Sequence, residues 1–149
     1  MDDLARLLIE RECLRLMTAY CTHLDSRDTD TFLELFLPEA TWIRTTAPVI
    51  DLPGRDAIRA FFNRRSTASV SRHLVVNPVV EVIDADHARG VSIGLVVRGP
   101  AGDSGYPVPM RGVELLVEYR DEFVRTAQGW RFARREMLRL IDVEAAPKT

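Results

Sequence analysis

The sequence predicts an α+β fold in which three N-terminal helices pack on a strongly curved antiparallel or mixed β-sheet. Up to residue 66, apolar side chains recur with helical spacing in three segments, whereas from residue 72 onward they alternate with a period of two. The later segments are joined by short or glycine- and proline-rich links, which favour antiparallel pairing. A curved sheet wrapped against helices forms a cone with an open mouth, so we expect an internal pocket for a small molecule.

The composition excludes several classes of protein. A chain of 149 residues predicts a single domain over residues 1–149 with a substantial core. Its 20 basic and 22 acidic residues leave a net charge of −2, without the basic surface that nucleic-acid binding requires. No apolar run approaches the roughly 20 residues of a membrane span, and the acidic N-terminus differs from a secretory signal. We therefore expect a cytoplasmic protein with neither a nucleic-acid nor a membrane partner.

The two cysteines agree with this location. Cys13 and Cys21 are too few for a disulfide framework, and their spacing on one predicted helix places them about 12 Å apart, too far to bridge each other. We interpret them as reduced thiols.

The first predicted helix spans residues 4–24. Its apolar residues recur at spacings of three, four and seven and form the predicted buried face: Leu4, Leu7, Leu8, Leu14, Met17, Cys21 and Leu24. Asp25 follows Cys21 by four residues, so it either continues this face or begins the turn that leads to Asp28, the expected cap of the next helix.

Two more helices and a strand complete the first half of the chain. The second helix covers residues 29–37 and ends before Pro38, which cannot continue it. Residues 40–46 are rich in β-branched and aromatic side chains and predict a strand. Residues 47–54 contain two prolines and a glycine and predict a loop, after which a third helix is expected over residues 55–66.

Four strands follow, and the first carries two polar side chains. The predicted strands cover residues 72–83, 88–98, 112–126 and 130–143. A period of two places His73 and Asn77 on the same face as Val75 and Val79. Either this face is wet and both are surface residues, or it lines the interior of the cone and both are the polar groups of a pocket.

Five short segments, spread over almost the whole chain, match a known family in their order and spacing. They are residues 20–28, 35–42, 54–58, 71–77 and 129–132. Together they resemble the SnoaL-like branch of the nuclear-transport-factor-2-like superfamily. The resemblance implies the cone-shaped fold. This superfamily includes dehydratases, isomerases, polyketide cyclases and plain binding proteins, so an activity has to be argued from the site.

The resemblance also implies a catalytic pair. In scytalone dehydratases and hexachlorocyclohexane dehydrochlorinases, an aspartate at the end of the first helix and a histidine at the start of the strand after the third helix form the catalytic dyad. Asp25 and His73 stand at the matching positions, and Trp42 stands where these enzymes place an aromatic residue near the cavity. Three positions depart from these relatives: Tyr20 replaces the dehydrochlorinase lysine, Ser92 falls near a second dehydratase histidine, and Leu24 falls near a substrate-holding tyrosine. We therefore do not assign the substrate of either enzyme to this chain.

An Asp25–His73 pair would supply a base without a metal or a cofactor. A neutral imidazole is available near neutral pH, and a carboxylate on one ring nitrogen fixes the tautomer and stabilises the imidazolium. Tyr20 is expected to donate a hydrogen bond to a developing oxyanion or leaving group. Four residues are expected to contact the substrate: Trp42, Asn77, Ser92 and Leu24. No metal-ligand spacing or phosphate-binding loop occurs in the sequence, so we expect no metal and no cofactor.

The predicted function is a cofactor-independent lyase or isomerase. It would act by elimination, dehydration or isomerisation on a small, largely apolar, cyclic or polyketide-like substrate. Two alternatives stay open: a non-catalytic small-molecule-binding domain, and an interaction subunit like the β subunit of ring-hydroxylating dioxygenases. The resemblance also favours a homo-oligomer, a dimer or trimer. We interpret the arginines of the last strand as solvated or interface charge: Arg131, Arg134, Arg135 and Arg139.

Overall fold

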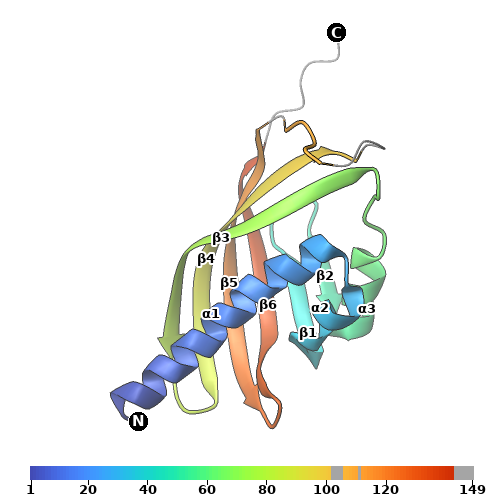
Figure 1. The fold of residues 1–149 in the computed structure, drawn as a ribbon. Coiled ribbons are helices and arrows are strands. Elements are labelled where there is room, and N and C mark those ends of the chain that lie inside the picture. Colours follow the sequence, from blue (N-terminus) through green and yellow to red (C-terminus); the bar gives the residue numbers. More distant parts are fainter. Residues whose placement is uncertain (102–105, 111, 143–149) are drawn as a thin grey trace.

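Three helices pack on a six-stranded sheet (Figure 1). The computed structural model describes residues 1–101, 106–110 and 112–142. The helices are α1 (Asp3–Ser26), α2 (Thr29–Glu34) and α3 (Gly54–Phe62). None of these described helices is both long and apolar enough to cross a membrane. The arrangement confirms the predicted α+β fold.

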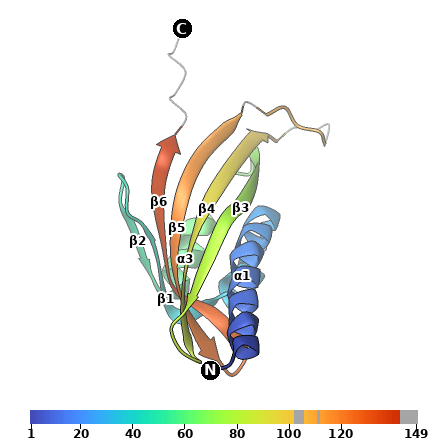
Figure 2. The same ribbon diagram turned by 90° about the vertical axis from the view of Figure 1, so that its left-hand side faces the viewer.

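The sheet is mixed, curved and open. Its strands are β1 (Phe36–Arg44), β2 (Ile50–Pro53), β3 (Ser69–Val82), β4 (His87–Pro100), β5 (Val113–Thr126) and β6 (Gly129–Asp142). Their order is β2-β1-β6-β5-β4-β3, and every neighbouring pair is antiparallel except β1 and β6, which are parallel. The long strands bend around α1, which lies along the edge strand β3 (Figure 2). The end predicted for the last strand, Val143, lies outside the described residues.

Two predicted segments near β1 are wrong. The second helix ends at Glu34, and β1 already begins at Phe36, where it pairs with Phe132 of β6. The register shifts between Phe36 and Thr41, and this irregularity accommodates Pro38 within a strand. Half of the predicted loop is the strand β2, which pairs with β1. Burial of Phe36 against the sheet thus overrides the local helical pattern.

The buried face of α1 also differs from the prediction. The residues that face the sheet are Ile9, Cys13, Leu16, Met17, Tyr20, Cys21 and Leu24. Leu4, Leu7 and Leu8 are 66%, 59% and 50% exposed. At about 100° per residue Leu4 and Leu8 fall on the opposite side of the helix from Cys13 and Met17, and Leu7 falls at the margin of the buried face, so the sheet does not cover them.

Glycines in β4 allow α1 and the aromatic core to approach the sheet. A Cβ atom on Gly90 would lie 2.2 Å from the Met17 methyl carbon, and one on Gly94 would lie 2.4 Å from the Tyr119 ring. Both positions lie on the concave face, where any larger side chain would displace the core. Because glycine has no side chain, these two positions let α1 and the aromatic residues pack close to the backbone of β4.

The interpretation of Arg135 as solvated or interface charge is wrong. Arg135 is completely buried, and its guanidinium donates two hydrogen bonds to Asp121, at 2.7 and 2.8 Å. The same guanidinium lies over the rings of Tyr20, Tyr119 and Phe132, at 3.9, 4.3 and 4.4 Å from their centroids. Burial acts to lower the pKa of Arg135, but the adjacent carboxylate outweighs it and raises this pKa above its usual value.

Candidate active site

Asp25 and His73 lie in contact where the end of α1 meets β3. Oδ1 of Asp25 is 2.5 Å from Nδ1 of His73, and Oδ2 accepts the backbone N–H of the same residue at 2.8 Å. Each side chain is only 11% exposed. Both carboxylate oxygens are therefore committed to His73, one to its ring and one to its backbone.

The topology of the sheet explains this contact. His73 is paired with Val96 of β4 on one side, and β3 is an edge strand, so its other side has no strand partner. An unpaired N–H on a partly buried edge is costly, and Asp25 satisfies it. The helix ends at Ser26, and the left-handed backbone of its C-cap residue Arg27, with φ of 61°, turns the chain away. Asp25 thus stabilises the strand edge as well as the imidazole.

A cleft of about 590 Å³ opens at this pair between α1 and β3. It is lined by Thr18, Cys21, Thr22, Asp25 and Ser26 of the helix and by Arg72, His73, Leu74 and Val75 of the strand. Apolar and hydroxyl-bearing residues predominate, and the ionisable residues are Cys21, Arg72 and the Asp25–His73 pair. Burial raises the pKa of the Cys21 thiol to about 11, so it is a neutral thiol near pH 7 and not a nucleophile.

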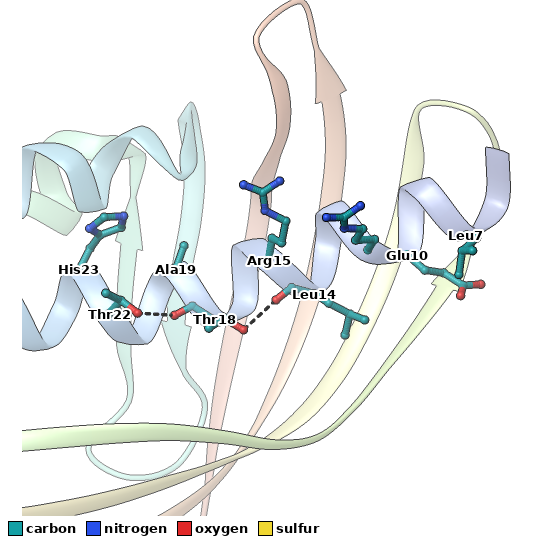
Figure 3. Close-up of a pocket in the computed structure, with 9 residues that line it drawn as sticks. Leu7, Glu10, Leu14, Arg15, Thr18, Ala19, Thr22 and His23 are labelled. Atoms are coloured by element: carbon teal, nitrogen blue, oxygen red, sulfur yellow. Dashed lines mark hydrogen bonds between the residues drawn. The ribbon is translucent and has the colours of Figure 1, made fainter. Parts of the chain in front are cut away.

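A second hollow, of about 550 Å³, lies farther along α1 toward its N-terminus and shares Thr18 and Thr22 with the first (Figure 3). All of its lining residues come from this one helix. The hydroxyls of Thr18 and Thr22 donate to the carbonyls of Leu14 and Thr18 one turn earlier, as the dashed lines in Figure 3 show. The cleft at Asp25 and His73 is the better candidate site, because it lies between two elements and contains the contact between these two side chains.

Tyr20 and Trp42 meet in the core. The indole N–H of Trp42 donates to the phenol oxygen of Tyr20 at 3.0 Å, and both side chains are buried. Burial raises the pKa of Tyr20 to about 12, against an opposing effect of Arg135. The phenol is therefore protonated at neutral pH, and its own proton has no protein acceptor in the described part of the chain. Neither residue lines the cleft at Asp25 and His73.

The remaining predicted contact residues lie in different environments. Asn77 is exposed and has a φ of 51°. The register of β3 shifts between Val76 and Val79, so the face shared by His73 and Val75 does not continue to Asn77. Ser92 is buried on the concave side with an unpaired hydroxyl, as judged over the described residues, and Leu24 is buried in the core.

The sequence reasoning missed three polar residues near these groups, Arg65, Ser71 and Asp121, and interpreted a fourth, Arg135, as solvated or interface charge. Ser71 could have been found, because it precedes His73 by two and shares its face. Asp121 alternates with Tyr119 and Phe123, a pattern that indicates an inward-facing position. Arg65 carries no such signal, because its role depends on a contact across the fold. No group of three or more metal-binding side chains occurs in the described ranges.

Comparison with known proteins identifies the family. The family model described as "SnoaL-like domain" matches residues 5–136. A search among curated proteins finds no match. The match covers α1 through most of β6 and therefore includes Asp25, His73 and the strands that surround them.

Solved structures share the fold. A protein provisionally named scytalone dehydratase, from Novosphingobium aromaticivorans, is 22% identical, with a TM-score of 0.77 over 97% of this chain and 92% of that one. An NTF2-like protein with a cystatin-like fold from the same organism is 27% identical, with a TM-score of 0.75 over 97% and 94%. ActVI-ORFA from Streptomyces coelicolor is 16% identical, with a TM-score of 0.72 over 87% and 95%.

Proposed function

The chain belongs to the family of SnoaL-like domains, and we propose that it is a cofactor-independent lyase or isomerase whose base is His73. The observation that carries the proposal is the 2.5 Å contact between Nδ1 of His73 and the Asp25 carboxylate at the wall of a cleft. A buried carboxylate on one ring nitrogen leaves the other nitrogen to face a ligand. This is the arrangement of a general base, and it needs no metal or organic cofactor.

The contact between Asp25 and His73 supports one route for the proton. Asp25 accepts the Nδ1 proton, so Nε2 carries the lone pair. Nε2 removes a proton from a substrate carbon, and the carboxylate stabilises the imidazolium that forms. In an elimination or dehydration, the electron pair of the broken C–H bond forms a double bond and the leaving group departs. In an isomerisation, a carbonyl oxygen holds the charge until His73 returns the proton to another carbon.

The cleft supports a small, largely apolar substrate. Val75 contributes an apolar side chain, and the hydroxyls of Thr18 and Thr22 are already bound within α1. A cyclic or polyketide-like molecule with one acidic C–H bond fits this surface. The provisional name of one structural neighbour, scytalone dehydratase, agrees with an elimination of this kind.

The roles of the other predicted residues belong to the same proposal. Tyr20 does not line the cleft, so its phenol would donate to an oxyanion or leaving group only of a substrate that extends into the core, and Trp42 would hold that phenol. The unpaired hydroxyl of Ser92 and the side chain of Leu24 would line the deeper part of the site. Asn77 has the weakest support, because it is exposed beyond the irregularity in β3.

The test uses defined carbon acids in place of the unknown substrate. The panel contains cyclic β-hydroxyketones, β,γ-unsaturated ketones and 5-nitrobenzisoxazole, incubated with wild type, His73→Gln and Asp25→Asn. We expect turnover of at least one probe by wild type, reduced about 10²- to 10⁴-fold in His73→Gln, the usual contribution of a general base. Equal turnover in His73→Gln would overturn the proposal. Binding of the probes without any conversion would also overturn it and favour the binding domain.

We also propose that the protein is a homo-oligomer located in the cytoplasm. The convex face of the sheet carries contiguous apolar side chains from four strands: Leu74, Val76, Ile93, Leu95, Leu116 and Leu138. The described helices pack on the other side of the sheet (Figure 2). A second copy would cover this face. The cytoplasmic location is supported by Cys13 and Cys21, which are buried and free.

A further inference from the structure

A half-buried arginine connects the end of α1 to the start of β3. Nη1 of Arg65 donates to the carbonyl oxygen of Leu24 at 2.7 Å, and Nη2 donates to the hydroxyl of Ser71 at 2.8 Å. The Ser71 hydroxyl in turn faces Oδ1 of Asp25 at 3.5 Å, the oxygen that also contacts Nδ1 of His73. One guanidinium is therefore linked through a single hydroxyl to the candidate pair.

The arginine is itself held in place by a second one. Arg27 donates to the carbonyl oxygens of Arg65, Ser66 and Ser69, at 3.4, 2.5 and 2.8 Å. These three contacts fix the segment between α3 and β3 against the end of α1. The hydrogen bonds of the two arginines cross the junction in opposite directions. Arg27, at the end of α1, donates to the segment between α3 and β3, and Arg65 of that segment donates to Leu24 of α1.

The positive charge of Arg65 offsets an unfavourable electrostatic interaction at this junction. Asp25 lies in the last turn of α1, where the unpaired carbonyls form the negative end of the helix dipole and disfavour a carboxylate. Arg65 binds one of those carbonyls and brings a positive charge to the same place. Burial lowers the pKa of Arg65, Arg27 lowers it further, and Asp25 acts in the opposite direction, so the two charges interact.

We propose that Arg65, acting through Ser71, is a positioning residue for the Asp25–His73 pair. It brings a positive charge to the helix end beside Asp25 and directs Oδ1 toward Nδ1 of His73. The imidazole is then held in the Nδ1–H tautomer with Nε2 free toward the cleft. The inference deepens the proposed function and rests on it for its catalytic meaning, but its first test needs no substrate.

The first test is the tautomer of His73, read from the ¹⁵N and ¹H NMR signals of its ring and assigned by their loss in His73→Gln. In wild type we expect the Nδ1–H form with a slowly exchanging ring proton. In Ser71→Ala and Arg65→Gln we expect a mixture of tautomers and about tenfold faster exchange, the order of effect of one charge-assisted hydrogen bond. Arg65→Lys keeps the charge and should restore part of the wild-type signal.

The matched control is Arg64→Gln, which removes the same charge from the neighbouring exposed position. We expect it to leave the His73 signals unchanged. The inference is overturned if Arg65→Gln and Ser71→Ala also leave them unchanged. If Arg65→Gln does not fold, Ser71→Ala decides alone, because it removes only one small hydroxyl.

The probe panel separates this inference from the proposed function. If wild type converts a probe and His73→Gln does not, we expect Ser71→Ala and Arg65→Gln to lower the rate and to broaden its pH profile, with Arg64→Gln as wild type. If no probe is converted but the tautomer shifts as expected, the proposed function fails and the positioning of His73 stands.

Discussion

At the scale of single residues, Asp25 combines a structural and a chemical role. Its Oδ2 accepts the edge N–H of β3, and its Oδ1 contacts the His73 ring. The two roles can be separated, because an amide oxygen can still accept the backbone N–H whereas a methyl group cannot.

We expect Asp25→Asn and Asp25→Ala to abolish activity to a similar extent but to differ in stability. Asp25→Ala leaves a buried N–H without a partner, which costs about 1–3 kcal/mol more than the amide variant. Urea unfolding of the two variants and wild type measures the difference. Equal free energies of unfolding for the alanine and asparagine variants would contradict the structural role.

The buried pair of Asp121 and Arg135 is the other residue-scale feature. Both side chains are fully inaccessible, and one guanidinium nitrogen, Nη1, has no hydrogen-bond partner in the part of the chain that the structure describes. A buried ion pair whose partner is removed leaves an uncompensated charge.

Asp121→Leu and Arg135→Met are each expected to destabilise the protein by about 3–5 kcal/mol. The double variant should lose less than the sum of the two single variants, because no charge is then buried. A double-mutant cycle based on denaturant midpoints measures this coupling. Strictly additive losses would show that the pair does not act as a unit.

At the scale of elements, α2 is a six-residue helix that depends on its N-cap. Asp28 accepts hydrogen bonds from the Thr31 hydroxyl and backbone N–H, and these hold the pKa of its carboxyl below the usual value. A carboxylate whose pKa is lower in the folded chain than in the unfolded chain stabilises the fold above the unfolded value of about 4. The contribution is lost as the pH falls through the folded value.

Asp28→Ala should therefore lower the urea midpoint at neutral pH, and its difference from wild type should shrink as the pH falls below about 4. Urea titrations at several pH values measure the difference. Glu34→Ala, which removes an exposed carboxylate from the same helix, is the control and should show no such convergence. A constant difference for Asp28→Ala at all pH values would exclude an ionic N-cap.

At the scale of the whole molecule, the convex face of the sheet determines the expected assembly. Leu95 lies near the centre of its apolar cluster, between Leu74 of β3 and Leu116 of β5. Charged residues such as Arg120 and Glu136 face each other farther along the same face. An apolar centre with a charged margin is typical of a subunit interface.

We expect the wild-type protein to sediment as a dimer or trimer and Leu95→Arg to sediment as a monomer, because a charge cannot be buried unpaired in such an interface. Sedimentation velocity, with circular dichroism to verify the fold, measures this. Leu7→Arg, on the exposed side of α1, is the matched control and should retain the wild-type state. A monomeric wild type would contradict the proposed assembly.

The fold class, the order of the elements apart from β2, and the two residues that meet at the candidate site could be predicted from the sequence. Hydrophobic periodicity depends on neighbours along the chain, so α1 and the long strands β3 to β6 were predicted within a few residues. The matching positions of Asp25 and His73 pointed to a contact that the structure shows at 2.5 Å. That the whole chain forms one domain stays a prediction.

Which polar groups are buried, and which residues bind them, depends on the tertiary structure. Arg135 looks like its neighbours Arg134 and Arg131 in the sequence, and only the curvature of the sheet places it under Tyr20 opposite Asp121. Similarly, Arg65 reaches the candidate pair only because the junction of α3 and β3 folds against the end of α1. Local sequence patterns indicate which face of an element is apolar. The partner of a polar side chain depends instead on contacts between segments that are far apart in the chain.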